Sequence, residues 1–181
     1  MLTTKKGVPT NAIFGFLTIL FKILNEDNPD YLAVAFDLKA PTFRHKMYDG
    51  YKAQRKGMPD ELAVQMPIIK EVLDALNISY IGLEGYEADD LIGTVSQKCE
   101  DLNLKCEILT GDRDDLQLCS ENTTVLLVTT QGGKTQTVPY NETGVLYKYE
   151  VTPSEFIDLK GCFSCGNTLP DDSDFCQYCG V

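Results

Sequence analysis

The chain has 181 residues, which is enough for one α/β domain with its own core and a small appendage. With 43% apolar and 24% charged residues, its composition is that of ordinary soluble globular proteins, and a formal net charge of −11 argues against indiscriminate binding to nucleic acid. No apolar run approaches the length of a membrane span, and the N-terminus lacks the basic-then-apolar order of a signal peptide, so we expect no membrane contact and a cytoplasmic location.

A helix and a strand are the first predicted elements. Apolar residues recur at helical spacing up to about Asn25, and either Thr10 or Asn11 can cap this helix. The run from Tyr31 to Phe36 is almost continuously apolar, which predicts a strand covered on both faces. Asp37 follows this strand directly, so the strand delivers a carboxylate to the edge of its sheet.

Residues 38–58 are polar, basic and aromatic together. Between Lys39 and Lys56 there are six Lys or Arg residues against a single acid, Asp49. Aromatic side chains stack on unpaired bases and cations neutralise phosphates, so this composition fits contact with a single-stranded nucleic acid. The alternative is a solvated, mobile loop, although loops of this length without a purpose are uncommon. We interpret the only histidine, His45, as a phosphate or structural contact without a catalytic role.

The remaining predicted elements alternate between helices and strands. In chain order they are a helix over 59–77 with a candidate kink at Pro67, a strand over 78–83, a helix from Glu87 to about Leu102, a strand over 105–110, a turn with a short helix over 111–118, short strands over 124–128 and 135–138 around the Gly132-Gly133 turn, a short helix over 143–149, and a helix from Thr152 to about Lys160.

Three carboxylates fall within four residues at the start of one of these helices, namely Glu87, Asp89 and Asp90. Acids in a first turn complement the helix dipole, but one acid would do this adequately. Three acids in one turn repel each other, and a divalent cation relieves that repulsion most simply. Carboxylate oxygens are ligands that suit Mg²⁺ or Mn²⁺. The acidic turn therefore predicts a metal site.

Acidic residues also follow two other predicted strands. Asp37 ends the first, and Asp112 and Asp114 follow the strand that ends at Thr110. In a parallel sheet these strand ends share one edge, so we expect the carboxylates to converge there. Such a set would bind two hard cations of the kind used in phosphodiester hydrolysis. The alternative is that Asp37 and Asp112 are ordinary turn or N-cap residues.

Six motifs together resemble the 5′-nuclease domain of bacterial DNA polymerase I, over roughly residues 2 to 160. In the order of that family they are 7–12, 33–37, 41–45, 51–55, 85–90 and 110–114, which read GVPTNA, AVAFD, PTFRH, YKAQR, GYEADD and TGDRD. The resemblance implies an α/β fold of the PIN or 5′-nuclease type, with a parallel sheet and flanking helices. It also implies a metal-dependent 5′-3′ exonuclease or flap endonuclease that hydrolyses DNA phosphodiester bonds.

The same resemblance implies residue roles. Residues 38–58 correspond to an arch over the active site, in which Lys52 and Arg55 match basic residues that contact the scissile phosphate. The implied ligands of Mg²⁺ or Mn²⁺ are Asp37, Glu87, Asp89, Asp90, Asp112 and Asp114. The expected nucleic-acid contacts are Arg44, His45, Lys46, Tyr51, Lys52 and Arg55. The expected partner is DNA with 5′ ends, flaps or single strands.

The chain departs from the family pattern at both ends. The family begins with a central strand that ends in an Asp-Gly-Asn motif and supplies a metal ligand, whereas this sequence starts after it. The family also continues past the position of Lys160 into an acidic loop and a helix-hairpin-helix. We therefore expect one metal position to be well supplied and the second poorly. Two alternatives follow: a weak or inactive nuclease-derived DNA-binding protein, or a chain whose true start lies upstream of Met1.

Four cysteines near the C-terminus form two knuckles, Cys162-x2-Cys165 and Cys176-x2-Cys179. Four thiolates at this spacing predict a closed, structural Zn²⁺ site, and disulfides are the weaker interpretation in a reducing cytoplasm. We therefore predict two domains, a nuclease-like domain over 1–160 and a zinc ribbon over 161–181 that adds a nucleic-acid or protein contact. The other cysteines, Cys99, Cys106 and Cys119, are expected to be small core or half-buried residues.

Overall fold

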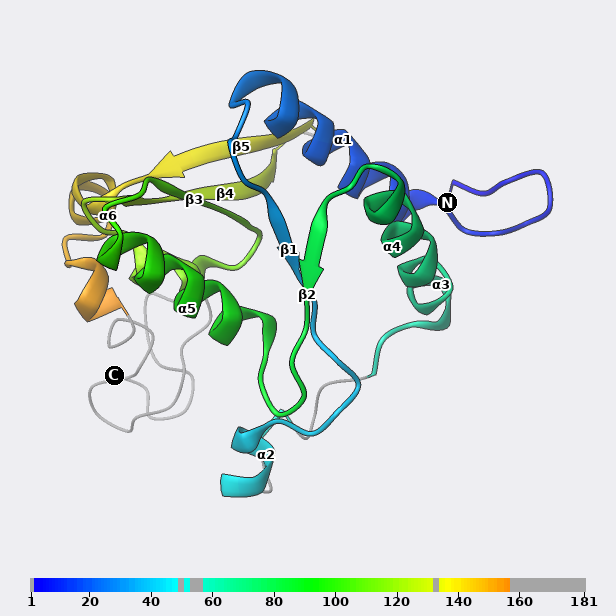
Figure 1. The fold of residues 1–181 in the computed structure, drawn as a ribbon, viewed down its shortest axis with the longest axis horizontal. Helices are drawn as coiled ribbons and strands as arrows, with labels where there is room; N and C mark the ends of the chain where they lie inside the picture. The colour runs from blue at the N-terminus through cyan, green and yellow to red at the C-terminus, as the bar shows by residue number, and fades with distance from the viewer. Residues whose placement is uncertain (1, 49–50, 53–56, 132–133, 157–181) are drawn as a thin grey trace. The chain divides into compact units, whose positions relative to one another are not determined.

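Two sheets organise the part of the chain that the structure describes, which comprises residues 2–48, 51–52, 57–131 and 134–156 (Figure 1). The structure is a computed structural model. Its contacts divide the chain into two compact units, Met1–Leu91 and Ile92–Val181, and each unit is described by itself. None of the helices in the described ranges is long and apolar enough to cross a membrane.

The first unit is a parallel pair of strands with helices. It contains α1 (Asn11–Glu26), β1 (Ala33–Ala35), α2 (Phe43–Met47), α3 (Asp60–Ala63), α4 (Met66–Ala75), β2 (Ser79–Ile81) and the first residues of α5 (Ala88–Asp101). Strands β1 and β2 run parallel, with Val34 opposite Tyr80. Because side chains alternate along a strand, these two residues face the same side of the pair.

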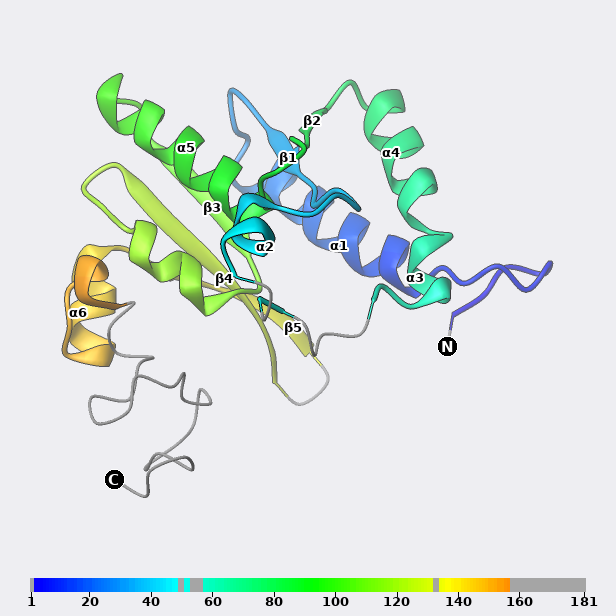
Figure 2. The same ribbon diagram turned by 90° about the horizontal axis from the view of Figure 1, so that it is seen from below.

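Helices α1 and α4 pack against that side of β1 and β2 (Figure 1, Figure 2). The core between them is formed by Leu20 of α1 and Ile69 and Leu73 of α4, and Leu73 is fully buried. Val34 and Tyr80 pack against this core from the strands. The apolar spacing that predicted both helices therefore reflects the stripes that they bury. The same small core covers one face of the two strands.

A buried glutamine ties these helices together. Gln65, which is 1% exposed, accepts hydrogen bonds at Oε1 from the backbone N–H groups of Ala12 (2.9 Å) and Ile13 (3.2 Å). Its Nε2 donates to the backbone carbonyl of Glu61 at 2.6 Å. Thr10 occupies the N-cap position of α1 without a side-chain capping bond. The free N–H groups at the start of α1 are therefore capped from a distant segment of the chain.

The helix predicted over 59–77 is interrupted. Helix α3 ends at Ala63 and α4 begins at Met66, so Pro67 lies in the first turn of α4. A proline is tolerated there because the N–H that it lacks would have no partner inside the helix. The expected kink at Pro67 is thus a helix boundary two residues before it, and this break presents Gln65 to α1.

The second unit contains a three-stranded mixed sheet. Its elements are the rest of α5, β3 (Cys106–Thr110), the 3₁₀ helix η1 (Arg113–Leu118), β4 (Thr123–Gln131), β5 (Lys134–Tyr140), α6 (Glu142–Tyr149) and the 3₁₀ helix η2 (Pro153–Glu155). Strand β4 lies parallel to β3 and antiparallel to β5. Leu116, Val125 and Val145 are fully buried at the centre of its core.

Most of the other predicted elements are confirmed. The described part of the basic segment, residues 38–58, includes the short helix α2, so the alternative of a loop throughout does not hold. The element opening at Thr152 has the predicted capping box with Glu155, but η2 is a 3₁₀ turn over its described residues. The zinc ribbon and its four cysteines lie outside the described residues, so the predicted domain boundary at 160 remains a prediction.

Gln65→Met tests the remote cap on α1. The substitution keeps most of the side-chain volume but leaves the N–H groups of Ala12 and Ile13 without their acceptor. We expect the free energy of unfolding, measured by urea denaturation, to fall by about 1–3 kcal/mol. The matched control is Gln97→Met, which removes only an exposed hydrogen bond to Asp101 and should change stability by less than about 0.5 kcal/mol. Equal effects of the two substitutions would contradict the assignment.

Candidate active site

The acidic turn follows strand β2 and opens α5. Gly85 has a positive φ of 88°, a conformation that side-chain-bearing residues rarely adopt. Its carbonyl accepts a 2.8 Å hydrogen bond from the backbone N–H of Phe43, the first residue of α2. The turn and the basic segment are thus joined through their backbones, at a point where the chain needs a glycine.

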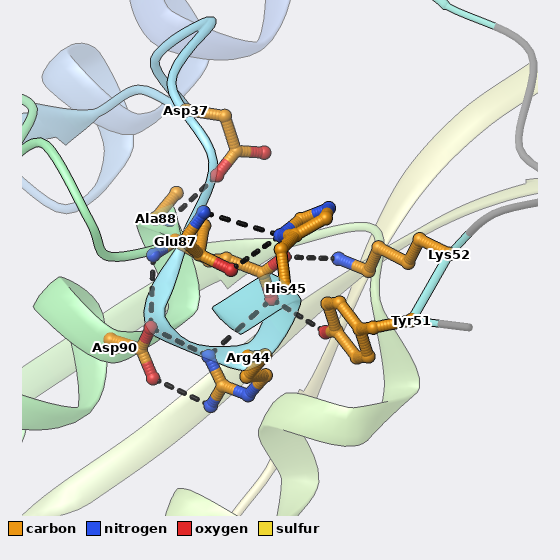
Figure 3. A network of polar contacts seen from close by, with 9 residues as sticks. Asp37, Arg44, His45, Tyr51, Lys52, Glu87, Ala88 and Asp90 are labelled. Carbon is orange, nitrogen blue, oxygen red and sulfur yellow. Dashed lines mark hydrogen bonds and ion pairs between the residues drawn. The ribbon is translucent and has the colours of Figure 1, made fainter. Parts of the chain in front are cut away.

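Asp37 follows the strand β1 and lies beside the start of α5 (Figure 3). Its Oδ1 accepts a 2.7 Å hydrogen bond from the backbone N–H of Ala88, the first residue of that helix. A carboxylate here satisfies a free N–H group and complements the positive end of the helix dipole. The expected proximity of Asp37 to the acidic turn is confirmed, and so is part of the simpler interpretation, because Asp37 acts as a cap.

Asp90 is held by Arg44 in a two-pronged ion pair (Figure 3). The two guanidinium nitrogens Nη1 and Nη2 donate to Oδ2 and Oδ1 at 2.8 and 2.7 Å. Asp90 Oδ2 also accepts from the backbone N–H of Glu87 at 2.9 Å. Such forked pairs are both stronger and more directional than single charged hydrogen bonds. Arg44 therefore fixes the basic segment to the acidic turn.

Glu87 is engaged by a second pair of groups from the basic segment. Its Oε1 accepts from Lys52 Nζ at 2.7 Å and its Oε2 from the Tyr51 hydroxyl at 2.9 Å. Arg44 Nη1 lies 3.6 Å from the same Oε2. Every carboxylate oxygen of Glu87 and Asp90 thus already accepts a hydrogen bond from the chain itself.

These contacts shift the pKa values of the carboxylates. The hydrogen bonds from Arg44 lower the pKa of Asp90, against the opposing effect of burial. Burial raises the pKa of Glu87, but the hydrogen bonds from Lys52 and Tyr51 outweigh it, so the pKa lies below its ordinary value. For Lys52, burial lowers the pKa, but the hydrogen bonds to Glu87 and Tyr51 outweigh burial, so the pKa lies above its ordinary value. Both acids are therefore ionised at neutral pH.

The other expected site residues of the first unit have different surroundings. His45 Nδ1 lies 2.8 Å from the Thr42 hydroxyl and accepts from the Thr42 backbone N–H, which completes a capping box on α2. Of the two contacts expected for His45, with a phosphate or within the structure, this is the structural one. Lys46 is exposed on α2 and Asp89 is exposed on α5. Arg55 lies outside the described residues.

Asp112 and Asp114 lie in the second unit, at the end of β3. Asp112 caps η1, since its Oδ1 accepts from the backbone N–H of Asp114 at 2.9 Å. Asp112 also lines an open groove of about 640 Å³, together with Gly111, Arg113, Leu127, Val128, Thr129 and Thr130. Asp112 is thus placed at the hollowed end of the parallel pair β3 and β4, as topology favours for ligand binding. Among the described residues, however, β3 belongs to a different sheet from β1 and β2, so the prediction of one sheet edge shared by all three groups of acids was wrong.

The donor chemistry of these acids fits a divalent cation, but their arrangement in this conformation does not. Carboxylate oxygens are the ligands that Mg²⁺ and Mn²⁺ prefer. Among the described residues, however, no three His, Cys, Asp or Glu side chains are grouped so as to hold an ion. In the first unit, Arg44 and Lys52 instead form ion pairs with Asp90 and Glu87, each at 2.7 Å.

The described cysteines fit the structural role predicted for them. Cys119 is buried, and Cys99 and Cys106 are partly buried. Burial raises the pKa of Cys119 and of Cys106 to about 11, so both thiols are protonated and unreactive at neutral pH.

The pairing of Arg44 with Asp90 was missed by sequence reasoning. The two residues are 46 positions apart, so no helical or strand period connects them. The only signal in the sequence was electrostatic, namely a segment of excess positive charge and a turn of excess negative charge. That signal predicts attraction between the two segments, but not the partners.

Comparison with known proteins gives a consistent family. Residues 1–150 match the family model described as the 5′-3′ exonuclease, N-terminal resolvase-like domain. The chain is 45% identical over 159 residues to DNA polymerase I of Caldicellulosiruptor bescii, which covers 88% of this chain and 19% of that protein. It is 42% identical over 157 residues to a 5′-3′ exonuclease of Aquifex aeolicus, which covers 87% of this chain and 52% of the relative. The chain thus spans about a fifth and about half of these two relatives.

Among solved structures, T5 5′-exonuclease with bound divalent metal ions (zinc) aligns with a TM-score of 0.60 and 18% sequence identity. The alignment covers 84% of this chain and 57% of the other. At this identity the likeness establishes the fold alone: an α/β nuclease fold with parallel strands and helices.

The forked ion pair gives a prediction for acid stability. Because the pKa of Asp90 is lower in the folded state, its contribution is fully present above the unfolded pKa near 4 and is lost as the pH falls through the folded value. We expect the free energy of unfolding of the wild type to fall more steeply below about pH 4.5 than that of Asp90→Asn, as measured by urea denaturation across a pH series.

The double substitution Arg44→Gln and Asp90→Asn provides the control. At pH 7 we expect the two single changes to show a coupling energy of about 1 kcal/mol, which decreases as the pH falls through the folded pKa of Asp90. Parallel acid limbs for wild type and Asp90→Asn, together with strict additivity at pH 7, would show that the pair contributes nothing.

Proposed function

We propose that this chain, which belongs to the 5′-3′ exonuclease N-terminal resolvase-like family, hydrolyses DNA phosphodiester bonds at or near 5′ ends, as a metal-dependent 5′-3′ exonuclease or flap endonuclease. The observation that carries the proposal is that Asp37, Glu87 and Asp90 lie together beside Arg44 and Lys52. Acids that suit a hard cation and bases that suit a phosphate are the two halves of a phosphodiester site.

The proposed metal ligands are the carboxylates that the family motifs imply. They are Asp37, Glu87, Asp89 and Asp90 in the first unit and Asp112 and Asp114 in the second. When bound, Mg²⁺ or Mn²⁺ would supply Lewis acidity for the attack of water on phosphorus. Within the described conformation, Asp37 orients the first turn of α5 and so fixes the backbone from which Asp89 and Asp90 project.

The proposed phosphate contacts come from the basic segment. Lys52 and Arg44 lie at the acidic turn and are 29% and 34% exposed, so they border solvent from which a strand could approach. Arg44 presents a fork that matches two phosphate oxygens, and Lys52 is a compact point charge. Lys46 adds an exposed cation on α2, and Tyr51 donates a hydrogen bond to Glu87. Arg55 is assigned here by the family motif, and His45 as a structural support of α2.

We also propose a structural zinc ribbon over 161–181, held by Cys162, Cys165, Cys176 and Cys179. The support is the spacing of two Cys-x2-Cys knuckles, each followed by a glycine. About twenty residues bury too little apolar surface to fold alone, so metal binding would supply their folding free energy. The ribbon would add a contact to nucleic acid or to a protein.

Asp37→Asn tests the proposed activity with a minimal change. An asparagine can still accept the Ala88 N–H bond, so the cap is kept while the negative charge is removed. We expect the rate of cleavage of a 5′-labelled flap DNA in Mg²⁺ or Mn²⁺ to fall by at least about 100-fold. Asp27→Asn, at the exposed C-terminal end of α1, should retain the wild-type rate within about twofold.

Equal rates for Asp37→Asn and wild type would contradict the assignment of Asp37. Cleavage by neither protein, with the DNA still bound by the wild type, would replace the nuclease with a DNA-binding protein built on the same scaffold. Absence of both cleavage and binding would contradict the proposed function as a whole.

The zinc proposal has its own measurement. Cys176→Ser should reduce the bound zinc, measured by elemental analysis of the purified chain, from about one atom per chain to near zero. The nuclease-like domain should keep its thermal transition, because its cores at Leu73 and Val125 lie in other parts of the chain. Zinc retained in the variant would contradict the site, and loss of the main transition would contradict the independence of the ribbon.

A further inference from the structure

The contacts at the acidic turn leave one inconsistency in the residue roles. Glu87 and Asp90 are assigned to a divalent cation, and Arg44 and Lys52 to a phosphate. In the structure the four side chains are paired with each other at 2.7 to 2.8 Å. These contacts oppose both roles, because each carboxylate oxygen already accepts a hydrogen bond and each cation is already neutralised by a carboxylate.

The charges of the two arrangements match. In the structure, the single positive charges of Arg44 and Lys52 neutralise the carboxylates of Asp90 and Glu87. One divalent cation would neutralise the same two carboxylates. Arg44 and Lys52 would then carry two positive charges without a partner, which is the charge needed to neutralise two phosphates of a DNA strand. After the exchange, each of the four charged side chains again lies beside a group of opposite charge.

We propose that Arg44 and Lys52 are resident counter-ions of the acidic turn, and that a divalent cation and a nucleic-acid strand enter by exchange of partners. The cation takes the carboxylates of Glu87 and Asp90, and the phosphates take the released guanidinium and ammonium groups. The inference rests on the metal site of the proposed function. Its consequence is that each ligand binds better once the other is present, before any bond is cleaved.

Two observations favour a pair of arrangements over a fixed one. Lys52, which contacts Glu87, has a φ of 52°, in the left-handed region that residues other than glycine seldom occupy. The side chains of Arg44 and Lys52 also remain about a third exposed, which gives an incoming strand access to them. Breaking the contacts would make two already accessible cations available to a strand.

The first test is metal affinity without DNA. Resident cations compete with the metal, so Arg44→Gln should bind Mn²⁺ about fivefold more tightly than the wild type, or better, as measured by electron paramagnetic resonance of free Mn²⁺. Lys39→Gln is the matched control, because it removes the same charge from an exposed residue of the same connecting segment. Its affinity should stay within about twofold of the wild type, since exposed charges are screened by salt. Equal gains in both variants would overturn the exchange.

The second test is the coupling between the two ligands. Binding of a 5′-phosphorylated single-stranded oligonucleotide to the wild type should tighten about fivefold or more on addition of Ca²⁺, a hard cation with the same oxygen ligands. In Arg44→Gln most of this tightening should be lost. A cation that merely bridges carboxylate and phosphate would give the same tightening in both proteins, and that result would overturn the proposal.

The two proposals fail in different ways. Wild type and Arg44→Gln with equal, measurable Mn²⁺ affinities would overturn the exchange and leave the metal site standing. No Mn²⁺ bound by either protein would overturn the metal site and the exchange with it. Thermal unfolding confirms that each variant is folded, and Arg44→Lys, which keeps the charge but loses the fork, should show a smaller gain in Mn²⁺ affinity than Arg44→Gln.

Discussion

The ion pair between Arg44 and Asp90 is the interaction on which the candidate site depends. It joins the short helix α2 to the first turn of α5. The backbone bond from Phe43 to Gly85 joins α2 to the turn that precedes α5. With Lys52 and Tyr51 on Glu87, it gathers two segments of opposite charge into one network. The network lowers the pKa values of Glu87 and Asp90 and at the same time engages the carboxylates that would bind a cation.

Remote capping is the second constraint in this unit. Gln65 caps the start of α1 from 53 residues away, and Asp37 caps the start of α5 from 51 residues away. Each cap satisfies free N–H groups at the start of a helix. Gln65 also ties α1 to the start of α4, and Asp37 ties the strand β1 to the acidic turn. Asp37 therefore serves a structural role in the same place where a catalytic role is proposed.

The sequence predicted the elements well and their partners poorly. Apolar periodicity located α1, α4, α5 and the strands to within a few residues, because these patterns record burial directly. Once the apolar runs had located the strands, the acids that follow each run could be recognised. The break before Pro67, the cap by Gln65 and the Arg44–Asp90 pair were not found, because each is decided by a contact across some fifty residues, for which a single sequence carries no periodic signal.

The central claim is that the chain's own cations hold the acidic turn when no divalent cation is bound. Nuclear magnetic resonance of the full chain labelled with ¹⁵N-arginine tests it directly, since the sequence contains only three arginines. We expect the guanidinium nitrogens of Arg44 to give separate, slowly exchanging signals without metal, and to average when Mg²⁺ is added or in Asp90→Asn. Averaged signals in the metal-free wild type would contradict the account.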